Sequence, residues 1–164
     1  MTSRAVVLAD THMYRRAREL PAAVLKELSQ ADLVFHLGDF TDPALLDLLH
    51  SFAPVHAVYG NNDPDELKQS LPRQKVVEIS GYRVAMLHGH KGGKTALAAA
   101  RNVDGADMVL FGHSHRPAHR VEDGRVLFNP GSPTDRRWWP ARSFGVLVIG
   151  DRIEPHLIPL VDDV

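Results

Sequence analysis

Short runs of apolar and β-branched residues recur along the whole chain, and in its first two thirds helical patterns separate them. Such runs predict strands, here at 4–9, 32–37, 54–59, 75–79, 82–87, 107–111, 125–128 and 143–150, with a last segment at 151–160 broken by Pro155 and Pro159. Helices are predicted over 19–30, 42–52 and 94–102. The alternation favours an α/β fold that starts with a largely parallel sheet and ends in hairpins. We expect two sheets packed face to face, with helices outside.

Length and composition narrow the class of protein. With 164 residues and no linker-like segment, the chain is expected to form a single domain over 1–164. A net charge of -1 gives no domain-wide attraction to nucleic acid or to an anionic membrane. The absence of Cys excludes disulfides and thiolate ligands. No apolar run approaches the ~20 residues of a membrane span and the amino terminus lacks a signal pattern, so a cytoplasmic location is expected.

Side chains that can bind metals directly follow five of the predicted strands. In an open sheet the carboxyl ends of parallel strands share one edge, so we expect these residues to converge there. Two of the clusters contain pairs at i and i+2, which extended backbone would place on one face. The seven residues are Asp10, His12, Asp39, Asn61, His88, His113 and His115.

Each of these residues has an ordinary structural explanation when it is taken alone, such as a helix cap for Asp10 or a turn hydrogen bond for His88. Together they offer more ligand atoms than one cation needs, which indicates two. Mixed nitrogen and oxygen donors suit Mn²⁺, Fe²⁺, Ni²⁺ or Zn²⁺. Two divalent ions facing the two carboxylates of Asp10 and Asp39 leave net positive charge, which attracts phosphate. Such a pair can polarise a phosphoryl group and activate water.

The motifs that carry these residues resemble those of the calcineurin-like metallophosphoesterases. ADTH, LGDF, YGNN, LHGH and FGHSH follow one another in the family's order over residues 9–115. NPGS at 129–132 resembles a later loop of the small bacterial and archaeal members, and the nearest subfamily is that of small phosphodiesterases with a Gly-Asn-x-Asp motif. The resemblance implies the metallo-dependent phosphatase fold, a four-layer αββα sandwich. It also implies a hydrolase that cleaves phosphodiesters by attack of a hydroxide bridging two metals.

Ligand roles follow from the same resemblance. One metal is expected on Asp10, His12 and His115, and the other on Asn61, His88 and His113, with Asp39 as the bridge. Mn²⁺ is the first choice of metal, and Ni²⁺, Fe²⁺ and Zn²⁺ are the alternatives. The residues expected to be catalytic are Asp39, Asn61, Asp63 and His88.

One position departs from the family pattern. Many relatives follow the ligand Asn with a His that donates a proton to the leaving oxygen, but here Asn62 takes that place. An amide is not a general acid, so much weaker activity is expected on simple alkyl esters than on activated aryl esters. Asp63 keeps the position that orients the His and also suits a helix cap before Pro64. His90 is expected beside the ligands or the substrate.

Two alternative functions are considered, and the segment at 135–142 is compatible with several roles. The same fold could be a non-catalytic metal-binding interaction scaffold, like the small retromer subunit. HGHKGGKT at 88–95 resembles a phosphate-binding P-loop, but His88 stands where that motif requires Gly. DRRWWPAR at 135–142 is compatible with a phosphate clamp, base stacking, a homodimer contact or packing over a sheet edge. The expected partner is a phosphoester, with nucleotide-like compounds included, and neither a membrane nor nucleic acid.

Overall fold

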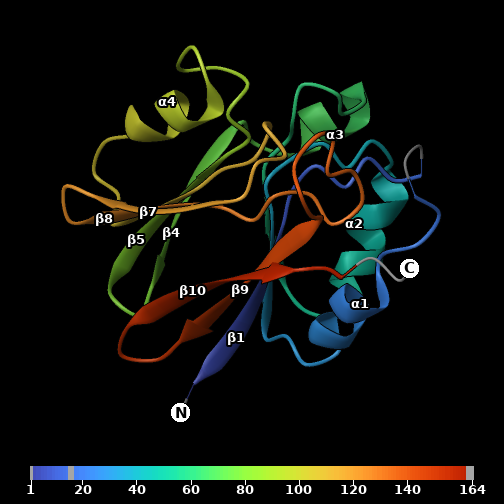
Figure 1. Cartoon of the computed structure of the whole chain (residues 1–164), viewed down its shortest axis with the longest axis horizontal. Coiled ribbons are helices and arrows are strands. Elements are labelled where there is room, and N and C mark those ends of the chain that lie inside the picture. Colours follow the sequence, from blue (N-terminus) through green and yellow to red (C-terminus); the bar gives the residue numbers. More distant parts are fainter. Residues whose placement is uncertain (1, 15–16, 162–164) are drawn as a thin grey trace.

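A computed structural model describes residues 2–14 and 17–161, and two five-stranded sheets form its centre (Figure 1). The first sheet has the strand order β10-β9-β1-β2-β3. β1, β2 and β3 are parallel, whereas β9 is antiparallel to both β1 and β10. The strands are β1 (Ser3–Leu8), β2 (Leu33–His36), β3 (Val55–Ala57), β9 (Ser143–Ile149) and β10 (Ile153–Pro159).

The second sheet has the order β4-β5-β6-β8-β7. Its central strands β5, β6 and β8 are parallel, and antiparallel pairs β4–β5 and β7–β8 form its two sides. The strands are β4 (Gln74–Ile79), β5 (Tyr82–Leu87), β6 (Met108–Leu110), β7 (Ala118–Glu122) and β8 (Arg125–Asn129). The expected mixture of an early parallel arrangement and late hairpins is therefore present, divided between two sheets.

Helices cover the outer faces of the sheets. Figure 1 shows α1 (Ala22–Leu28) and α2 (Pro43–His50) beside the first sheet, and α4 (Ala96–Arg101) over the second. α2 begins where the sequence indicates, because the Asp42 side chain accepts a hydrogen bond from the Ala44 N–H with Pro43 at the first helical position. The remaining helix is α3 (Asp65–Ser70). None of the helices formed by the described residues has the length and apolar character that a membrane crossing requires.

Three buried clusters hold the layers together. Val7, Phe35, Met86, Leu110 and Phe128 belong to the cluster between the sheets. A second cluster joins α1 and α2 to the first sheet, and a third, rich in alanine, joins α4 to the second sheet. The order helix, sheet, sheet, helix confirms the predicted α/β four-layer sandwich.

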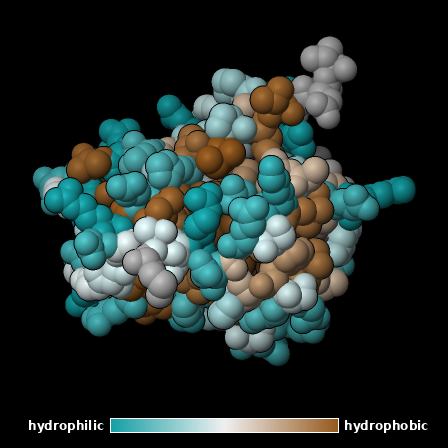
Figure 2. Space-filling view, turned by 90° about the horizontal axis from the view of Figure 1, so that it is seen from below, coloured by the Kyte–Doolittle hydropathy of each residue, from teal (hydrophilic) through white to brown (hydrophobic). Residues whose placement is uncertain are grey.

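Two strands differ from the prediction. β7 was not predicted, because its residues are exposed or half-buried and form no apolar run. β10 continues through Pro155, which pairs with Leu147 of β9. β10 lies at the edge of its sheet, where proline is tolerated because only one side of the strand is hydrogen-bonded. Figure 2 shows the molecule from below, where β1 begins, and hydrophobic residues there are interspersed with hydrophilic ones.

Candidate metal centre

The loops that follow β1, β2, β3, β5 and β6 meet at one end of the sandwich. Backbone hydrogen bonds tie them together within each sheet, from Asp10 N to Gly38 O at 3.0 Å and from Gly112 N to His88 O at 3.0 Å. The His113 N–H donates to Asp10 Oδ2 at 2.9 Å and so connects the two sheets. The expectation of one shared sheet edge was wrong, because the strand ends belong to two sheets packed against each other.

The backbone at the clusters is left-handed, with φ of 54° at Asp10, 44° at His12, 61° at Asp39, 73° at His113 and 59° at His115. The prediction that extended backbone places each i, i+2 pair on one face was therefore wrong. Left-handed conformations at residues with a side chain are strained and persist where the surroundings enforce them. Tight turns, and not strand periodicity, aim these side chains at one point.

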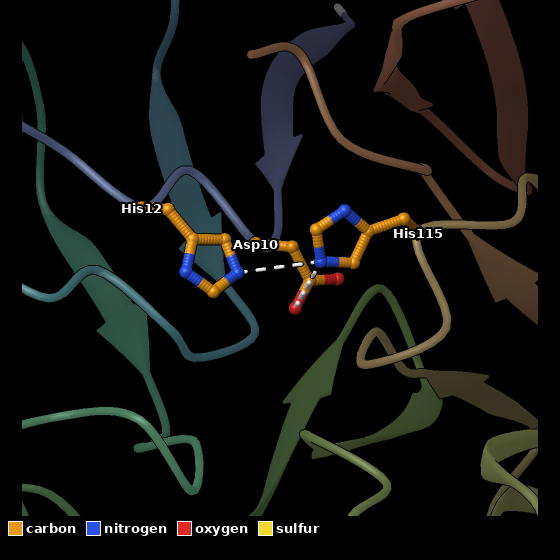
Figure 3. Close-up of side chains that lie close together, drawn as sticks. All are labelled: Asp10, His12 and His115. Carbon is orange, nitrogen blue, oxygen red and sulfur yellow. Dashed lines mark hydrogen bonds and ion pairs between the residues drawn. The ribbon is translucent and has the colours of Figure 1, made fainter. Parts of the chain in front are cut away.

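Asp10, His12 and His115 form the first donor group (Figure 3). His12 Nε2 lies 3.3 Å from His115 Nε2, and His115 Nε2 lies 3.8 Å from Asp10 Oδ1. Asp10 and His115 are buried, and the His12 side chain is 12 % exposed. Two imidazole nitrogens that face each other beside a buried carboxylate are a suitable environment for a cation.

Asp10, Asp39 and His88 form the second donor group. His88 Nε2 lies 3.6 Å from Asp10 Oδ1 and 3.3 Å from Asp39 Oδ2, and His12 Nε2 lies 3.5 Å from the same Asp39 oxygen. Asp10 Oδ1 and His88 Nε2 are buried and have no hydrogen-bond partner among the described residues. Buried polar atoms are normally paired, so the donor set fits metal coordination.

Backbone carbonyls fix the orientation of two imidazoles. His88 Nδ1 lies 2.8 Å from Leu37 O, and His115 Nδ1 lies 2.5 Å from Asp135 O. Because a carbonyl only accepts, each Nδ1 carries the proton and Nε2 of a neutral ring is left with a lone pair toward the centre. This is the arrangement by which metal-binding histidines are held in proteins.

Burial and charge set the protonation of the group. Burial lowers the pKa of His115 to about 4 and also lowers the pKa values of His12 and His113, so these rings are neutral near pH 7. Burial raises the pKa of Asp10 to about 7. For His88, burial acts to lower the pKa, but Asp10 and Asp39 outweigh it and raise the pKa to about 9. The two carboxylates thus favour the charged form of the His88 imidazole.

Asn62 holds the carboxylate of Asp39. Its backbone N–H donates to Oδ1 and its Nδ2 to Oδ2, both at 2.9 Å. Burial acts to raise the pKa of Asp39, but the adjacent His88 and the two Asn62 contacts hold it well below its usual range. The residue in the place of the family's proton donor is therefore a positioning residue for the predicted bridging ligand.

Asp63 also braces this region. The side chain is buried, and its Oδ2 accepts from Gly60 N at 2.7 Å and Asp39 N at 2.9 Å, while Oδ1 accepts from Thr41 N at 2.9 Å. The expected helix cap was wrong, because α3 begins at Asp65 and no side chain caps it. Because the Asp63 carboxylate accepts from these three N–H groups, it has less capacity to orient a catalytic group.

The two donor groups consist of aspartates and histidines, and the predicted residues Asn61, His113 and His90 are not members of them. Asn61 is exposed, and its side chain makes no hydrogen bond among the described residues. The rings of His113 and His90 lie 5.1 Å and 5.4 Å from that of His88, measured between centroids. The structure therefore brings together Asp10, His12, Asp39, His88 and His115.

Glycine is required before two of the clusters. A Cβ at Gly60 would lie 2.1 Å from Asp39 Oδ1, and one at Gly38 would lie 2.6 Å from Gly60 N. Gly38 also has a φ of 99°, a conformation that side chains disfavour. The Gly-Asp and Gly-Asn pairs of the sequence thus reflect close contact between two loops.

Sequence reasoning missed the role of the 129–132 loop. Ser132 Oγ donates to Asp10 O at 2.8 Å and accepts from Asp135 N at 2.9 Å. Asn129 Nδ2 donates to Gly112 O at 3.2 Å. NPGS was recognisable as a turn, but nothing in the motif itself indicates that it holds the loops after β1 and β6.

Comparison with known proteins agrees with this description. Residues 4–152 match the model of the calcineurin-like phosphoesterase superfamily domain. The chain is 40% identical over 160 residues to a probable metallophosphoesterase of Methanocaldococcus jannaschii, covering 94% of this chain and 80% of that protein.

Two solved structures share the fold. Vacuolar protein sorting 29 from Cryptosporidium parvum superposes with a TM-score of 0.79 at 18% identity, over 98% of this chain and 99% of that one. A novel archaeal phosphodiesterase has a TM-score of 0.74 at 23% identity, over 96% and 99% of the two chains. The family model spans most of the sequence. The fold of the chain places two groups of potential metal ligands where the two sheets meet. This chain therefore belongs to the calcineurin-like phosphoesterase superfamily.

Proposed function

We propose that the chain is a phosphodiesterase that works with two divalent transition-metal ions. The observation that carries the proposal is the pair of buried donor groups, which share Asp10 and leave its Oδ1 and His88 Nε2 without hydrogen-bond partners among the described residues. Asp39 Oδ2 lies 3.5 Å from His12 Nε2 and 3.3 Å from His88 Nε2, a position from which one carboxylate can serve both groups.

The chain's own residues have definite tasks in this proposal. Asp10, His12 and His115 would hold one ion, and Asp39 and His88 would hold the other, with Asn61 and His113 as the predicted further ligands. Bound there, a metal pair lowers the pKa of a water molecule and polarises the phosphoryl group. Asn62 keeps both oxygens of Asp39 in place, and the backbone N–H of His113 fixes Asp10 Oδ2. Nitrogen and oxygen donors suit Mn²⁺, Fe²⁺, Ni²⁺ and Zn²⁺, and among these we propose Mn²⁺ as the metal.

The residue beside Asp39 supports a preference for aryl over alkyl leaving groups. Asn62 cannot supply a proton, and both of its nitrogens are occupied by the Asp39 carboxylate. A missing general acid costs roughly 10²- to 10⁴-fold where the leaving group needs a proton, and aryl leaving groups do not need one. We therefore expect activity first on activated aryl diesters. The similarity in fold to an archaeal phosphodiesterase supports the same class.

The test uses the full chain prepared with Mn²⁺. We expect elemental analysis to find two ions per chain, and hydrolysis of bis(p-nitrophenyl) phosphate that a chelator abolishes and Mn²⁺ restores. Asp10→Asn should lose this activity, whereas Asp47→Asn, an exposed carboxylate on α2, should keep it. Hydrolysis that persists unchanged in chelator would refute the proposal.

The second candidate function is a metal-binding interaction scaffold. It is favoured by the likeness in fold to a vacuolar protein sorting protein. A chain that binds two ions per molecule but hydrolyses none of a panel of phosphodiesters with Mn²⁺, Ni²⁺, Fe²⁺ or Zn²⁺ would support the scaffold and overturn the enzyme.

A further inference from the structure

A cavity of about 460 Å³ opens beside the turn that carries His113 and His115. Ser114, the residue between these two histidines, is part of its wall, and consecutive Cα atoms are only ~3.8 Å apart. Much of the remaining wall is apolar and comes from Ala96 and Leu97 of α4 and from Phe111. The cavity therefore lies beside the turn that carries two of the predicted ligands, and none of its lining residues belongs to either donor group.

Trp139 forms another wall of the cavity and is anchored to the same turn. Its Nε1–H donates to Ser114 O at 3.0 Å, and the residue is half-buried. The neighbouring Trp138 is 75% exposed and does not line the cavity. Of the two tryptophans in the 135–142 segment, one is thus built into a cavity next to the centre and the other is left in solvent.

Arg116 supplies the positive charge at the cavity. Its guanidinium carbon lies 5.1 Å from the centroid of the Trp139 ring, and it forms no ion pair with a carboxylate among the described residues. Arg120 also lines the cavity, but its Nε lies 2.8 Å from Glu122 Oε2. The wall therefore combines an aromatic face with an exposed guanidinium that forms no ion pair with any carboxylate of the described residues.

We infer that this cavity binds a planar aromatic group carried by a phosphate ester whose phosphate lies at the metal centre. The inference rests on the proposed function and names its substrate class. Apolar walls and the Trp139 ring favour a flat ring, the unpaired Arg116 favours an anion, and the volume is within the range of small-molecule sites. A simple aryl ring and a nucleobase share this chemistry.

The experiment measures binding by calorimetry to the Mn²⁺-loaded protein, with methyl phosphate, phenyl phosphate and adenosine 5′-monophosphate as probes. We expect the two aromatic esters to bind about tenfold more tightly than methyl phosphate, since stacking on an aromatic side chain has an effect of this order. Whichever aromatic ester binds more tightly identifies the ring that the cavity prefers. Equal affinities for all three probes would overturn the inference.

Variants test whether the preference comes from this cavity. Trp139→Ala should reduce it to below about twofold with little change for methyl phosphate, while the matched control Trp138→Ala keeps it. Arg116→Gln should weaken the aromatic esters severalfold, and Arg152→Gln, an exposed arginine after β9, should not. If Trp139→Ala does not fold, Trp139→Leu removes the ring but retains apolar volume. An aromatic preference that survives in a folded Trp139 variant without the ring would refute the assignment.

Hydrolysis separates the two proposals. Aromatic preference in binding without hydrolysis of any diester would overturn the proposed function and support the cavity assignment. Hydrolysis of a diester combined with equal affinities for methyl and aromatic esters would support the proposed function and overturn the cavity assignment. Failure of all three esters to bind the metal-loaded protein would overturn the cavity assignment.

Discussion

Replacement of Asp63 by Asn tests whether Asp63 stabilises the surrounding loops or takes part in the reaction. The Asp63 carboxylate accepts hydrogen bonds from the backbone N–H groups of Gly60, Asp39 and Thr41 at 2.7, 2.9 and 2.9 Å. Asparagine offers only one acceptor oxygen, which can replace Oδ2 toward Gly60 and Asp39, but its amide then faces the Thr41 N–H. Leaving the part-buried Thr41 N–H unpaired costs about 1–2 kcal/mol, and the loss of charge assistance in the two other bonds costs about 1 kcal/mol each.

Part of this cost is offset, because burial raises the pKa of Asp63 and a neutral amide avoids that penalty. We therefore expect the free energy of unfolding of the metal-free protein to fall by about 2–4 kcal/mol, which for a chain of this length corresponds to roughly 4–16 °C in Tm. Thermal and urea unfolding measure it. Asp65→Asn, exposed in the first turn of α3, is the control and should change stability by less than about 1 kcal/mol.

The reasoning would be refuted by an Asp63→Asn protein with unchanged Tm and a large loss of phosphodiester hydrolysis. That result would assign Asp63 to the reaction itself, as the family pattern implies. The expected result is the opposite order, in which stability falls first and metal affinity follows, because the Asp39 loop is no longer held.

Three further predictions concern the centre. Asp39→Asn should lower phosphodiester hydrolysis by at least about 10²-fold, since it weakens the ligand placed between His12 and His88, and equal loss in His156→Ala would contradict this. The folded-state pKa of His88 is raised to about 9 from 6.5, so its stabilisation is complete below pH 6.5 and is lost as pH rises to 9. The Tm of the metal-free protein should therefore fall from pH 7 to 9, and a Tm that rises over this range would refute the pKa direction. Ser132→Ala should weaken Mn²⁺ binding about tenfold in calorimetry, because it removes the hydrogen bonds of Ser132 Oγ with Asp10 O and Asp135 N. Ser29→Ala at the end of α1 should have no effect. Unchanged Mn²⁺ affinity in Ser132→Ala would show that the 129–132 loop is not needed to hold the centre.

Local patterns in the sequence were sufficient for most of the fold. Apolar runs identified the buried strands, and Asp42 with Pro43 marked the start of α2, because burial and capping depend on neighbouring residues. β7 has no apolar run, since its side chains are mostly in solvent, and only its hydrogen bonds to β8 define it as a strand. Edge strands of this kind leave little signal in the sequence.

The side chains of the candidate centre were recognisable from the sequence, but the geometry that joins them was not. Asp10 and His113 are 103 positions apart, and their contact depends on how two sheets pack. The same holds for Asp63, whose acceptors serve N–H groups 22 and 24 positions away as well as the nearby Gly60. Short-range patterns contain no information on such contacts, so capping was the natural but mistaken interpretation.

Because the donor groups combine residues from both sheets, metal binding should affect the rate of unfolding more than the rate of folding. Asp10, His12 and Asp39 follow strands of one sheet, whereas His88 and His115 follow strands of the other. Donors so far apart in sequence come together only after the sheets have packed, and interactions formed late stabilise the native state without speeding its formation. A bound cation would thus connect the loops of the two sheets. It would leave the refolding rate unchanged and slow unfolding. The unfolding half-life of the metal-loaded chain would therefore be longer than that of the metal-free chain.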